Sequence, residues 1–154
     1  MSVESLGAGG ETGLRRVPPD DEAFLAALGE VGMPRDDLGA SHGVYFALVD
    51  ARGLPLGYCG YEPLENGLAL IRSCVVPRGN RGKGAGRAMM DALIDLLAGE
   101  GMRELYLLTM DADPFFARFG FETIARDEAP DAVRASTQFT MECCNDAVLM
   151  RRGL

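Results

Sequence analysis

The apolar positions of the chain recur with two different spacings, and each spacing predicts one kind of secondary structure. Between residues 84 and 100, the apolar residues Met90, Leu93, Ile94 and Leu97 recur three and four positions apart. This spacing places them on one face of a helix. Short stretches that are continuously apolar or that alternate predict strands, because successive side chains of a strand point to opposite faces of a sheet.

The same patterns predict elements along the chain after residue 13, without an internal repeat or a long linker. The predicted strands cover residues 14–17, 44–50, 54–64, 68–77, 104–109, 120–125 and 147–151, and further helices cover 18–32, 113–119 and 129–139. Asn66-Gly67 is a hairpin-turn signal between two of these strands. This order predicts one α/β (α+β) domain, residues 14–154, with antiparallel hairpins and at least one strand–helix–strand crossover. We expect residues 1–13 to be a flexible arm.

Composition and charge narrow the classes of partner. The formal net charge of −8 argues against a general nucleic-acid or anionic-membrane binder, since both need a cationic face. No apolar run approaches the length of a membrane span, and the N-terminus has neither the cationic start nor the apolar stretch of a signal peptide. We therefore expect a cytoplasmic protein. A homodimer is compatible with the sequence, which does not fix the oligomeric state.

Cations nevertheless gather in one loop, between the strand at 68–77 and the helix at 84–100. Arg78, Arg81 and Lys83 lie there and Arg87 follows in the first turn of the helix, so four cations fall within ten residues of a chain with far more acidic than basic residues. The loop is either a site for one anionic ligand or a solvated charged segment. Lys83 is the only lysine of the chain, but Arg replaces Lys everywhere else, so we give the lysine itself little weight.

Glycines make the same loop suitable for a diphosphate. Gly82, Gly84 and Gly86 allow the backbone to approach a ligand closely, and the free N–H groups at the start of a helix attract anions. A P-loop would need Ser or Thr after its Gly-Lys pair, but Gly84 follows Lys83. A dinucleotide-binding loop would need G-x-G-x-x-G, whereas these glycines are spaced G-x-G-x-G. Spacing therefore excludes both familiar loops.

The cysteines and the single histidine, His42, do not suggest a metal site. None of the four cysteines is spaced as C-x-x-C, so we expect no structural zinc. Cys59 and Cys74 lie in apolar strand patterns and are predicted to be core thiols. The adjacent pair Cys143-Cys144 is either a surface pair that has no function or a site for a soft metal or for redox chemistry.

Arg81, Gly84 and Gly86 form the pattern R-x-x-G-x-G directly after a strand ending in Val-Val. This resembles the acetyl-CoA signature of the GCN5-related N-acetyltransferase (GNAT) superfamily. The preceding hairpin, the strand "LYLLT" and the segment "FFARFGF" at 115–121 extend the resemblance from about residue 14 to the C-terminus. It implies a mixed, mostly antiparallel sheet of about six or seven strands, splayed at the acetyl-CoA site and flanked by helices on both faces.

The resemblance also implies which residues bind acetyl-CoA. The backbone of Cys74, Val75 and Val76 would form hydrogen bonds with the pantetheine arm, which would lie beside it like an additional strand. Pro77 lies four residues before Arg81, one more than is usual in the family, which a shifted bulge would accommodate. The remaining implied acetyl-CoA residues are Arg81, Gly82, Lys83, Gly84, Ala85, Gly86, Arg87 and Phe116.

Phe116 stands where many members of the family have a tyrosine that protonates the leaving thiolate. A phenyl ring cannot donate a proton. Either another group or solvent protonates the leaving thiolate, or the thiolate leaves without being protonated. No catalytic residue is therefore assigned. Tyr58, Tyr61 and Tyr106 are candidates by residue type only.

A narrower resemblance concerns the substrate. The segments at 70–77, 105–109, 115–121 and 129–150 look like those of arsenic-resistance-associated N-acetyltransferases and, more distantly, of the N-acetylglutamate synthase catalytic domain. Both favour an amino acid or analogue. Arg72 would either bind the carboxylate of the substrate or form a structural ion pair, and the sequence favours neither role. Arg134 would either bind the substrate or lie at the surface. Cys143 or Cys144 occupies the place of the synthase's substrate-binding arginine, so we do not expect glutamate itself, and a thiophilic substrate becomes conceivable.

Three functions are compatible with these residues. The first is an acetyl-CoA-dependent N-acetyltransferase acting on the primary amine of a small molecule. The second is a catalytically weak acyl-CoA-binding sensor or partner protein, which Phe116 and the acidic surface motivate. The third is a protein N-terminal acetyltransferase, which needs an open peptide groove that the turn at 129–139 is placed to close.

Overall fold

The chain forms a single twisted sheet with helices on both faces. The computed structural model describes residues 12–33, 35, 38, 42–140 and 146–154. The strands are β1 (Gly13–Val17), β2 (Val44–Val49), β3 (Pro55–Leu64), β4 (Leu68–Val75), β5 (Glu104–Thr109), β6 (Glu122–Ile124) and β7 (Val148–Gly153). The helices are α1 (Glu22–Glu30), α2 (Ala85–Gly99), α3 (Asp113–Ala117), α4 (Asp131–Arg134) and α5 (Thr137–Thr140).

The seven strands lie in the order β1-β2-β3-β4-β5-β7-β6. Neighbouring strands run antiparallel except β4 and β5, which pair in parallel because α2 connects them as a crossover. The predicted mixed, mostly antiparallel sheet is therefore confirmed. Predicted and observed boundaries differ by a few residues at most for the strands, and the helical stretch predicted at 129–139 is divided into α4 and α5.

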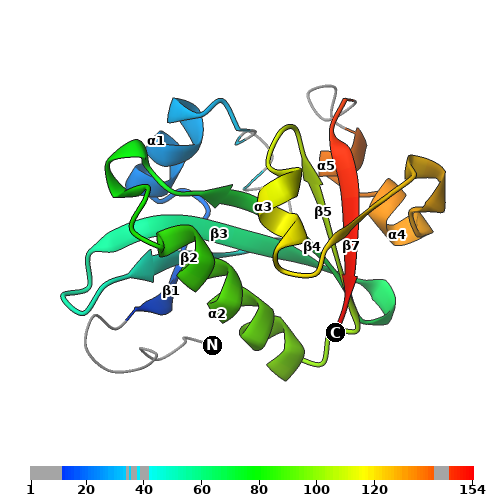
Figure 1. Ribbon diagram of the computed structural model, residues 1–154, viewed down its shortest axis with the longest axis horizontal. Helices are drawn as coiled ribbons and strands as arrows, with labels where there is room; N and C mark the ends of the chain where they lie inside the picture. Colours follow the sequence, from blue (N-terminus) through cyan, green and yellow to red (C-terminus); the bar gives the residue numbers. More distant parts are fainter. Residues whose placement is uncertain (1–11, 34, 36–37, 39–41, 141–145) are drawn as a thin grey trace.

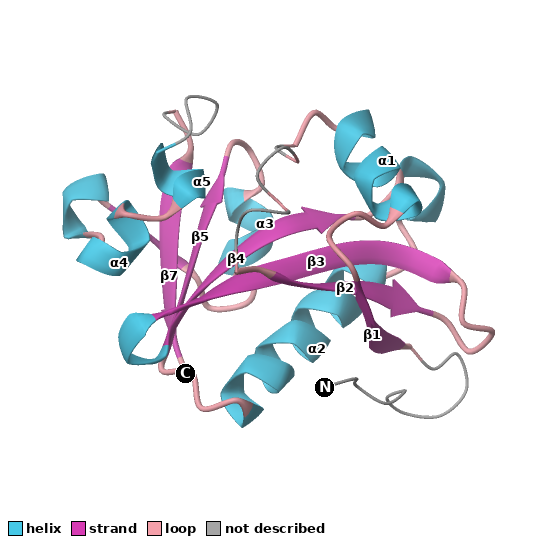
Figure 2. Ribbon diagram, turned by 180° about the vertical axis from the view of Figure 1, so that it is seen from behind, coloured by secondary structure: helices cyan, strands magenta, loops and turns pink. Residues whose placement is uncertain are grey.

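The sheet separates two layers of helices. Figure 1 shows α2 and α3 on the near face, and Figure 2 shows α1, α4 and α5 on the opposite face. The apolar side of α2, including Met90, Leu93 and Leu97, packs on Phe46, Ile71 and other residues of the near face. On the far face, Phe24 and Leu28 of α1 pack on Tyr45 and Tyr58, while Val133 of α4 packs on Leu70 and Tyr106.

Local signals in the sequence explain several element ends. Asp21 accepts a hydrogen bond from the N–H of Phe24 and so caps the start of α1 (3.0 Å). Asn66 and Gly67 both adopt positive φ, 62° and 75°, and turn β3 into β4 as the Asn-Gly signal predicts. Gly84 precedes α2 with φ 79°, in the left-handed region that glycine adopts without strain.

Two expectations fall partly outside the described residues. Most of the predicted N-terminal arm, residues 1–11, lies outside them, and β1 begins at Gly13, one residue earlier than predicted. Cys143 and Cys144 also lie outside them. Within the described part of the chain, no helix has the length and apolar character needed to cross a membrane.

Candidate active site

A β-bulge interrupts β4 near its C-terminal end. Gly60 of β3 pairs with Arg72 and Tyr58 pairs with Val75, so Cys59 alone faces the two residues Ser73 and Cys74. Ser73 adopts φ 60°, which is unusual for a residue other than glycine. This two-against-one arrangement is a bulge, and a bulge bends the strand, here at the C-terminal end of β4.

The two central strands separate beyond the bulge. β4 and β5 pair from Leu68 with Glu104 to Ile71 with Leu107, and their ladder ends there although both strands continue. A cavity of about 530 Å³ lies at the opening. Its walls come from β4, β5, the start of α2, α3 and the turn after α1. The cavity therefore reaches helices on both faces of the sheet, by way of the gap between the two strands.

Six of the residues implied as acetyl-CoA ligands line this cavity, namely Cys74, Val75, Val76, Arg81, Gly86 and Phe116. The others, Gly82, Lys83, Gly84, Ala85 and Arg87, are not among the described lining residues, but they belong to the same loop and to the first turn of α2. The structure thus brings the second half of β4, the glycine loop and α3 to one place.

The backbone of the glycine loop has N–H groups available for a ligand. The N–H of Arg81 donates to the carbonyl of Arg78, and the next backbone bond along the chain runs from Ala88 to the carbonyl of Gly84. Within the described residues, no backbone hydrogen bond is donated by residues 82–87. Cβ atoms built on Gly82 and Gly84 would meet open space, so both glycines are required by their positive φ and leave the approach to their amides clear.

Arg81 fastens the loop to the strand. Its Nε donates to the carbonyl of Val76 (2.9 Å), and its side chain is otherwise exposed. The extra residue between Pro77 and Arg81 is accommodated in a 3₁₀ turn, Arg78–Asn80. Inside this turn the N–H of Asn80 donates to the carbonyl of Pro77 (2.8 Å). The departure from the family's spacing therefore leaves the loop beside the end of β4.

Aromatic side chains close the α3 side of the cavity. The ring of Phe116 is buried and meets Phe115 edge-on, with centroids 5.2 Å apart, and Phe121 in a similar way at 6.0 Å. A Cβ on Gly86 would lie 3.3 Å from Cζ of Phe115, a tight contact that the ring could relieve only by shifting. The close packing of α3 on α2 explains the third glycine of the loop. None of these rings can transfer a proton.

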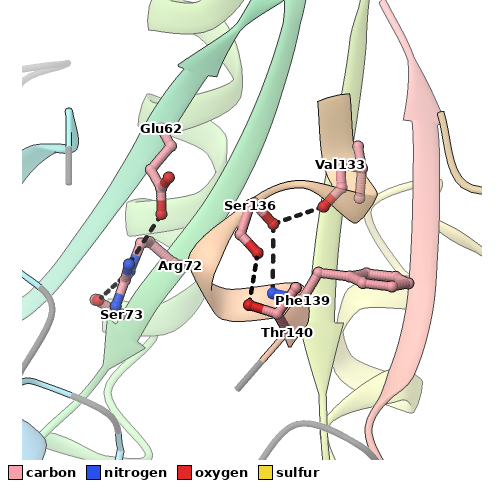
Figure 3. A network of polar contacts seen from close by, with 7 residues as sticks. All are labelled: Glu62, Arg72, Ser73, Val133, Ser136, Phe139 and Thr140. Atoms are coloured by element: carbon pink, nitrogen blue, oxygen red, sulfur yellow. Dashed lines mark hydrogen bonds and ion pairs between the residues drawn. The ribbon is translucent and has the colours of Figure 1, made fainter. Parts of the chain in front are cut away.

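Arg72 lies in the wall of the cavity and in a buried ion pair. Its Nη1 donates to Oε2 of Glu62 (2.9 Å), and its Nε donates to Oγ of Ser73 (3.3 Å), as Figure 3 shows. The side chains of Arg72 and Glu62 are 1% and 10% exposed. Of the two predicted roles for Arg72, the structural ion pair is therefore observed. Arg72 also donates to Ser73 at the bulge, and because it is among the residues lining the cavity its role toward a substrate stays a prediction.

The other two predicted substrate residues differ in their positions. Arg134 is exposed and donates from Nε to the carbonyl of Ala129 (3.1 Å) and from Nη2 to that of Asp127, and it is not among the described residues of the cavity wall. It therefore stabilises the turn before α4. Buried Ser136 ties the next turn, since its Oγ donates to the carbonyl of Val133 (2.6 Å; Figure 3). Cys143, as stated, is outside the described residues.

The three tyrosines proposed by residue type lie away from the cavity wall. Tyr58 and Tyr61 are buried under α1 and α2, and Tyr106 donates to Oε1 of Glu104 (3.0 Å) near the other end of β5. Burial raises the pKa of each. Burial likewise raises the pKa of Cys74, which does line the cavity, from 9.0 to about 12. This thiol is neutral at physiological pH, so it is both a weak acid and a weak nucleophile.

Sequence reasoning missed two segments of the cavity wall, residues 31–33 after α1 and residues 108–112, which form the end of β5 and the turn beyond it. The sequence contains a signal for the second segment. Neighbouring parallel strands bring their carboxyl ends together, and "TMD" stands at the carboxyl end of the strand that α2 connects to β4. The first had none, because only the packing of α1 on the far face brings its end to the gap. Among the described residues, no three His, Cys, Asp or Glu side chains gather as metal ligands would.

Comparison with known proteins agrees with this arrangement. The model of the acetyltransferase (GNAT) family matches residues 16–121. An uncharacterized N-acetyltransferase of Chlorobaculum tepidum is 32% identical over 110 residues, which make up 71% of this chain and 70% of that protein.

Several solved structures share the fold. N-acetylglutamate synthase from Neisseria gonorrhoeae, complexed with coenzyme A and N-acetyl-glutamate, has a TM-score of 0.77 at 21% identity, over 96% of this chain and 36% of the synthase. Rv2747 from Mycobacterium tuberculosis, in complex with CoA and NLQ, has a TM-score of 0.72 at 19% identity, over 92% and 98% of the two chains. From the family match, the relative and the splayed sheet together, we conclude that the chain belongs to the acetyltransferase (GNAT) family and is an N-acetyltransferase.

Proposed function

We propose that the protein transfers the acetyl group of acetyl-CoA to the primary amine of a small molecule, an amino acid or an amino-acid analogue. The observation that carries this proposal is the cavity in the gap between β4 and β5. It connects the glycine loop on one side of the sheet with Arg72 and the end of α1 on the other. Two ligands can then meet in the gap from opposite faces.

The residues present fit acetyl-CoA. The free amides of residues 82–87 and the positive end of α2 would hold the pyrophosphate. The backbone of Cys74, Val75 and Val76 would pair with the pantetheine arm, since β5 no longer pairs with this part of the strand. Phe116 would pack beside the arm, and Lys83 and Arg87 would add charge at the loop. When bound, acetyl-CoA supplies an activated acetyl group and a thiolate leaving group.

The residues of this chain would orient the two substrates and exclude water from them, whereas none of them is assigned to proton transfer. Phe115 and Phe116 provide an apolar wall. The thiol of Cys74, with a pKa of about 12, is a poorer acid than a coenzyme A thiol and would not protonate the leaving thiolate. We therefore assign neither a general acid nor a general base to a residue of this chain.

The acceptor end of the proposal is supported by Arg72. Arg72 is among the residues that line the cavity, and a guanidinium donates paired hydrogen bonds that suit a carboxylate. One relative of the same fold, N-acetylglutamate synthase from Neisseria gonorrhoeae, has been crystallised with N-acetyl-glutamate and with L-arginine. Arg134, whose side chain donates to the carbonyls of Ala129 and Asp127, is not part of this proposal.

The test is release of free thiol from acetyl-CoA in the presence of a panel of amines. We expect product above the hydrolytic rate with at least one free amino acid, identified by mass spectrometry as the N-acetyl derivative. Phe116 in place of tyrosine favours a second candidate, a weak acyl-CoA sensor. Tight acetyl-CoA binding without turnover on any amine or peptide would support the sensor and overturn the proposal. Turnover on peptides alone would instead support the protein N-terminal acetyltransferase.

A further inference from the structure

Thr109 brings a hydroxyl group to the coenzyme side of the gap between the strands. It is the last residue of β5, and it lines the cavity. Side chains alternate along a strand, and Leu107 packs in the cluster of α2, whereas Leu108 packs in the cluster of α4. Thr109 therefore points to the same face as Leu107, which is the face that α2 and α3 cover (Figure 1).

A hydrogen bond fixes the position of this hydroxyl group. Its Oγ1 accepts from the N–H of Ala112, directly before α3 (3.0 Å). A hydroxyl group can accept and donate at the same time, and its hydrogen can rotate toward an acceptor. Within the described residues, the hydroxyl of Thr109 donates to no group. The oxygen is thus held in place while its hydrogen is available to a ligand.

The register of the two central strands places Thr109 level with the bulge. Their ladder ends with Ile71 opposite Leu107, so two further steps along both strands bring Thr109 to the level of Ser73. Under the proposed function, the pantetheine arm pairs with residues 74–76 and runs outward to the glycine loop. Its inner end, which carries the sulfur atom, would then lie level with the bulge and across the gap from Thr109.

The other described polar side chains of the wall are less suited to this sulfur atom. The Nε of Arg72 donates to Oγ of Ser73, and Arg81 donates to a carbonyl of β4. A carboxylate such as that of Asp111 accepts hydrogen bonds and would repel a thiolate, and the thiol of Cys74 is only a weak donor. Thr109 is therefore the best-placed donor among the described residues of the wall.

We infer that the hydroxyl of Thr109 donates a hydrogen bond to the sulfur of coenzyme A while the thioester is cleaved. The inference rests on the proposed function and adds a catalytic residue to the same site. As the amine attacks, the bond between the acetyl carbon and sulfur breaks, its electron pair stays on sulfur, and the amine releases its proton to solvent. An alcohol is a weaker acid than a thiol, so Thr109 keeps its proton and the thiolate is protonated by solvent afterwards. A donor aimed at a developing charge lowers the barrier.

Isothermal titration with CoA and with desulfo-CoA, which lacks the sulfur, isolates this contact without any acceptor. At about pH 9.5 most of the CoA is thiolate, because thiols lose their proton near about pH 8.5. Thr109→Val should weaken the binding of CoA about tenfold, since it removes a hydrogen bond to a charged group, and should leave the binding of desulfo-CoA unchanged. Thr109→Ser should bind both ligands as the wild type does.

Equal weakening of both ligands in Thr109→Val would show that the hydroxyl supports only the fold or the arm. That result would overturn the inference and leave the proposed function standing, as would unchanged affinity for CoA. No binding of either ligand to the wild type would overturn the proposed function as well.

Turnover of an amine that the wild type acetylates gives a second readout. Thr109→Val should lower kcat about tenfold with little change in the KM for acetyl-CoA, and Thr109→Ser should retain the wild-type kcat. Thr123→Val is the matched control, because Thr123 is exposed on β6 and is not among the described residues of the cavity wall. Equal kcat values in Thr109→Val and Thr123→Val would overturn the inference.

Discussion

Arg72 and Glu62 form a buried ion pair beside the bulge of β4. Both side chains are nearly buried, and their ion pair lies beside Ser73, the residue with the strained backbone of the bulge. A buried charge without its partner is strongly unfavourable, whereas the pair itself adds little net stability. The pair therefore allows a cation to stand in the wall of an apolar cavity.

Glu62→Gln should lower the free energy of unfolding by about 3 kcal/mol, because it removes the countercharge of a buried guanidinium. Urea unfolding followed by circular dichroism measures this. Glu65→Gln is the control, since Glu65 is exposed in the turn after β3 and its change should stay within about 0.5 kcal/mol. Equal effects of the two changes would mean that the ion pair does not support the fold.

The Cys74 thiol gives a pH prediction. Burial raises its pKa from 9.0 to about 12, so the unfolded chain loses this proton near pH 9 and the folded chain only near pH 12. The contribution of this thiol to stability is therefore fully present below pH 9 and is lost as the pH rises toward 12.

At pH 8 the Cys74 thiol should accordingly react with iodoacetamide at least tenfold more slowly in the native protein than in urea, as peptide mass spectrometry can follow. Native reaction as fast as that of the unfolded chain would show a thiolate in the cavity. A role as an acetyl-carrying nucleophile would then have to be considered.

At the scale of single residues, the role of a residue could be predicted from the sequence where the residue acts through its own backbone. It could not be predicted where the role depends on a partner far away in the sequence. Gly82, Gly84 and Gly86 could be assigned to the loop because their function follows from the absence of a side chain. The partner of Arg72 could not be chosen among the many acidic residues, because strand pairing alone brings Glu62 to it.

At the scale of elements, α2 and its loop act as one unit. The helix has an apolar face that packs under the sheet, and its first turn has no side-chain cap. Its starting N–H groups are therefore left for a ligand instead of being satisfied by the chain. The apolar period predicted this helix almost to the residue, whereas the bulge in β4 has no local sign, since Ser73 is neither glycine nor asparagine.

Gly84→Asp should weaken acetyl-CoA binding by tenfold or more. The new side chain strains a residue with φ 79° and places a negative charge where the pyrophosphate is proposed to lie. Isothermal titration measures the affinity. Gly99→Asp is the matched control, because it adds the same charge at the other end of α2, where a Cβ also meets open space. Undiminished affinity in Gly84→Asp would contradict the assignment of the loop.

At the scale of the whole molecule, the sheet is fastened at one end and open at the other. Near the hairpin, the N–H of Arg103 donates to the carbonyl of Gly67 (2.6 Å), and the Nε of Arg103 donates to the carbonyl of Asn66 (2.8 Å). The N–H of Leu154 donates to the carbonyl of Arg103 (2.9 Å). These bonds join the β3–β4 turn, the start of β5 and the end of β7. The overall order of strands followed from the sequence, but the separation of β4 from β5 depends on contacts between distant segments, which local patterns do not contain.

The one-ended pairing of β4 and β5 has a consequence for hydrogen exchange. Amides between Leu68 and Ile71 belong to a continuous ladder and should exchange slowly, whereas residues 74–76 should exchange quickly on the side that β5 has left. Acetyl-CoA should slow exchange at 74–76 and 82–87 and leave Leu68–Ile71 unchanged, as mass-resolved deuterium uptake can show. Acetyl-CoA would then take the place that β5 leaves beside the end of β4 and extend the hydrogen-bonded structure there. The protein without acetyl-CoA would be less protected from exchange than the complex.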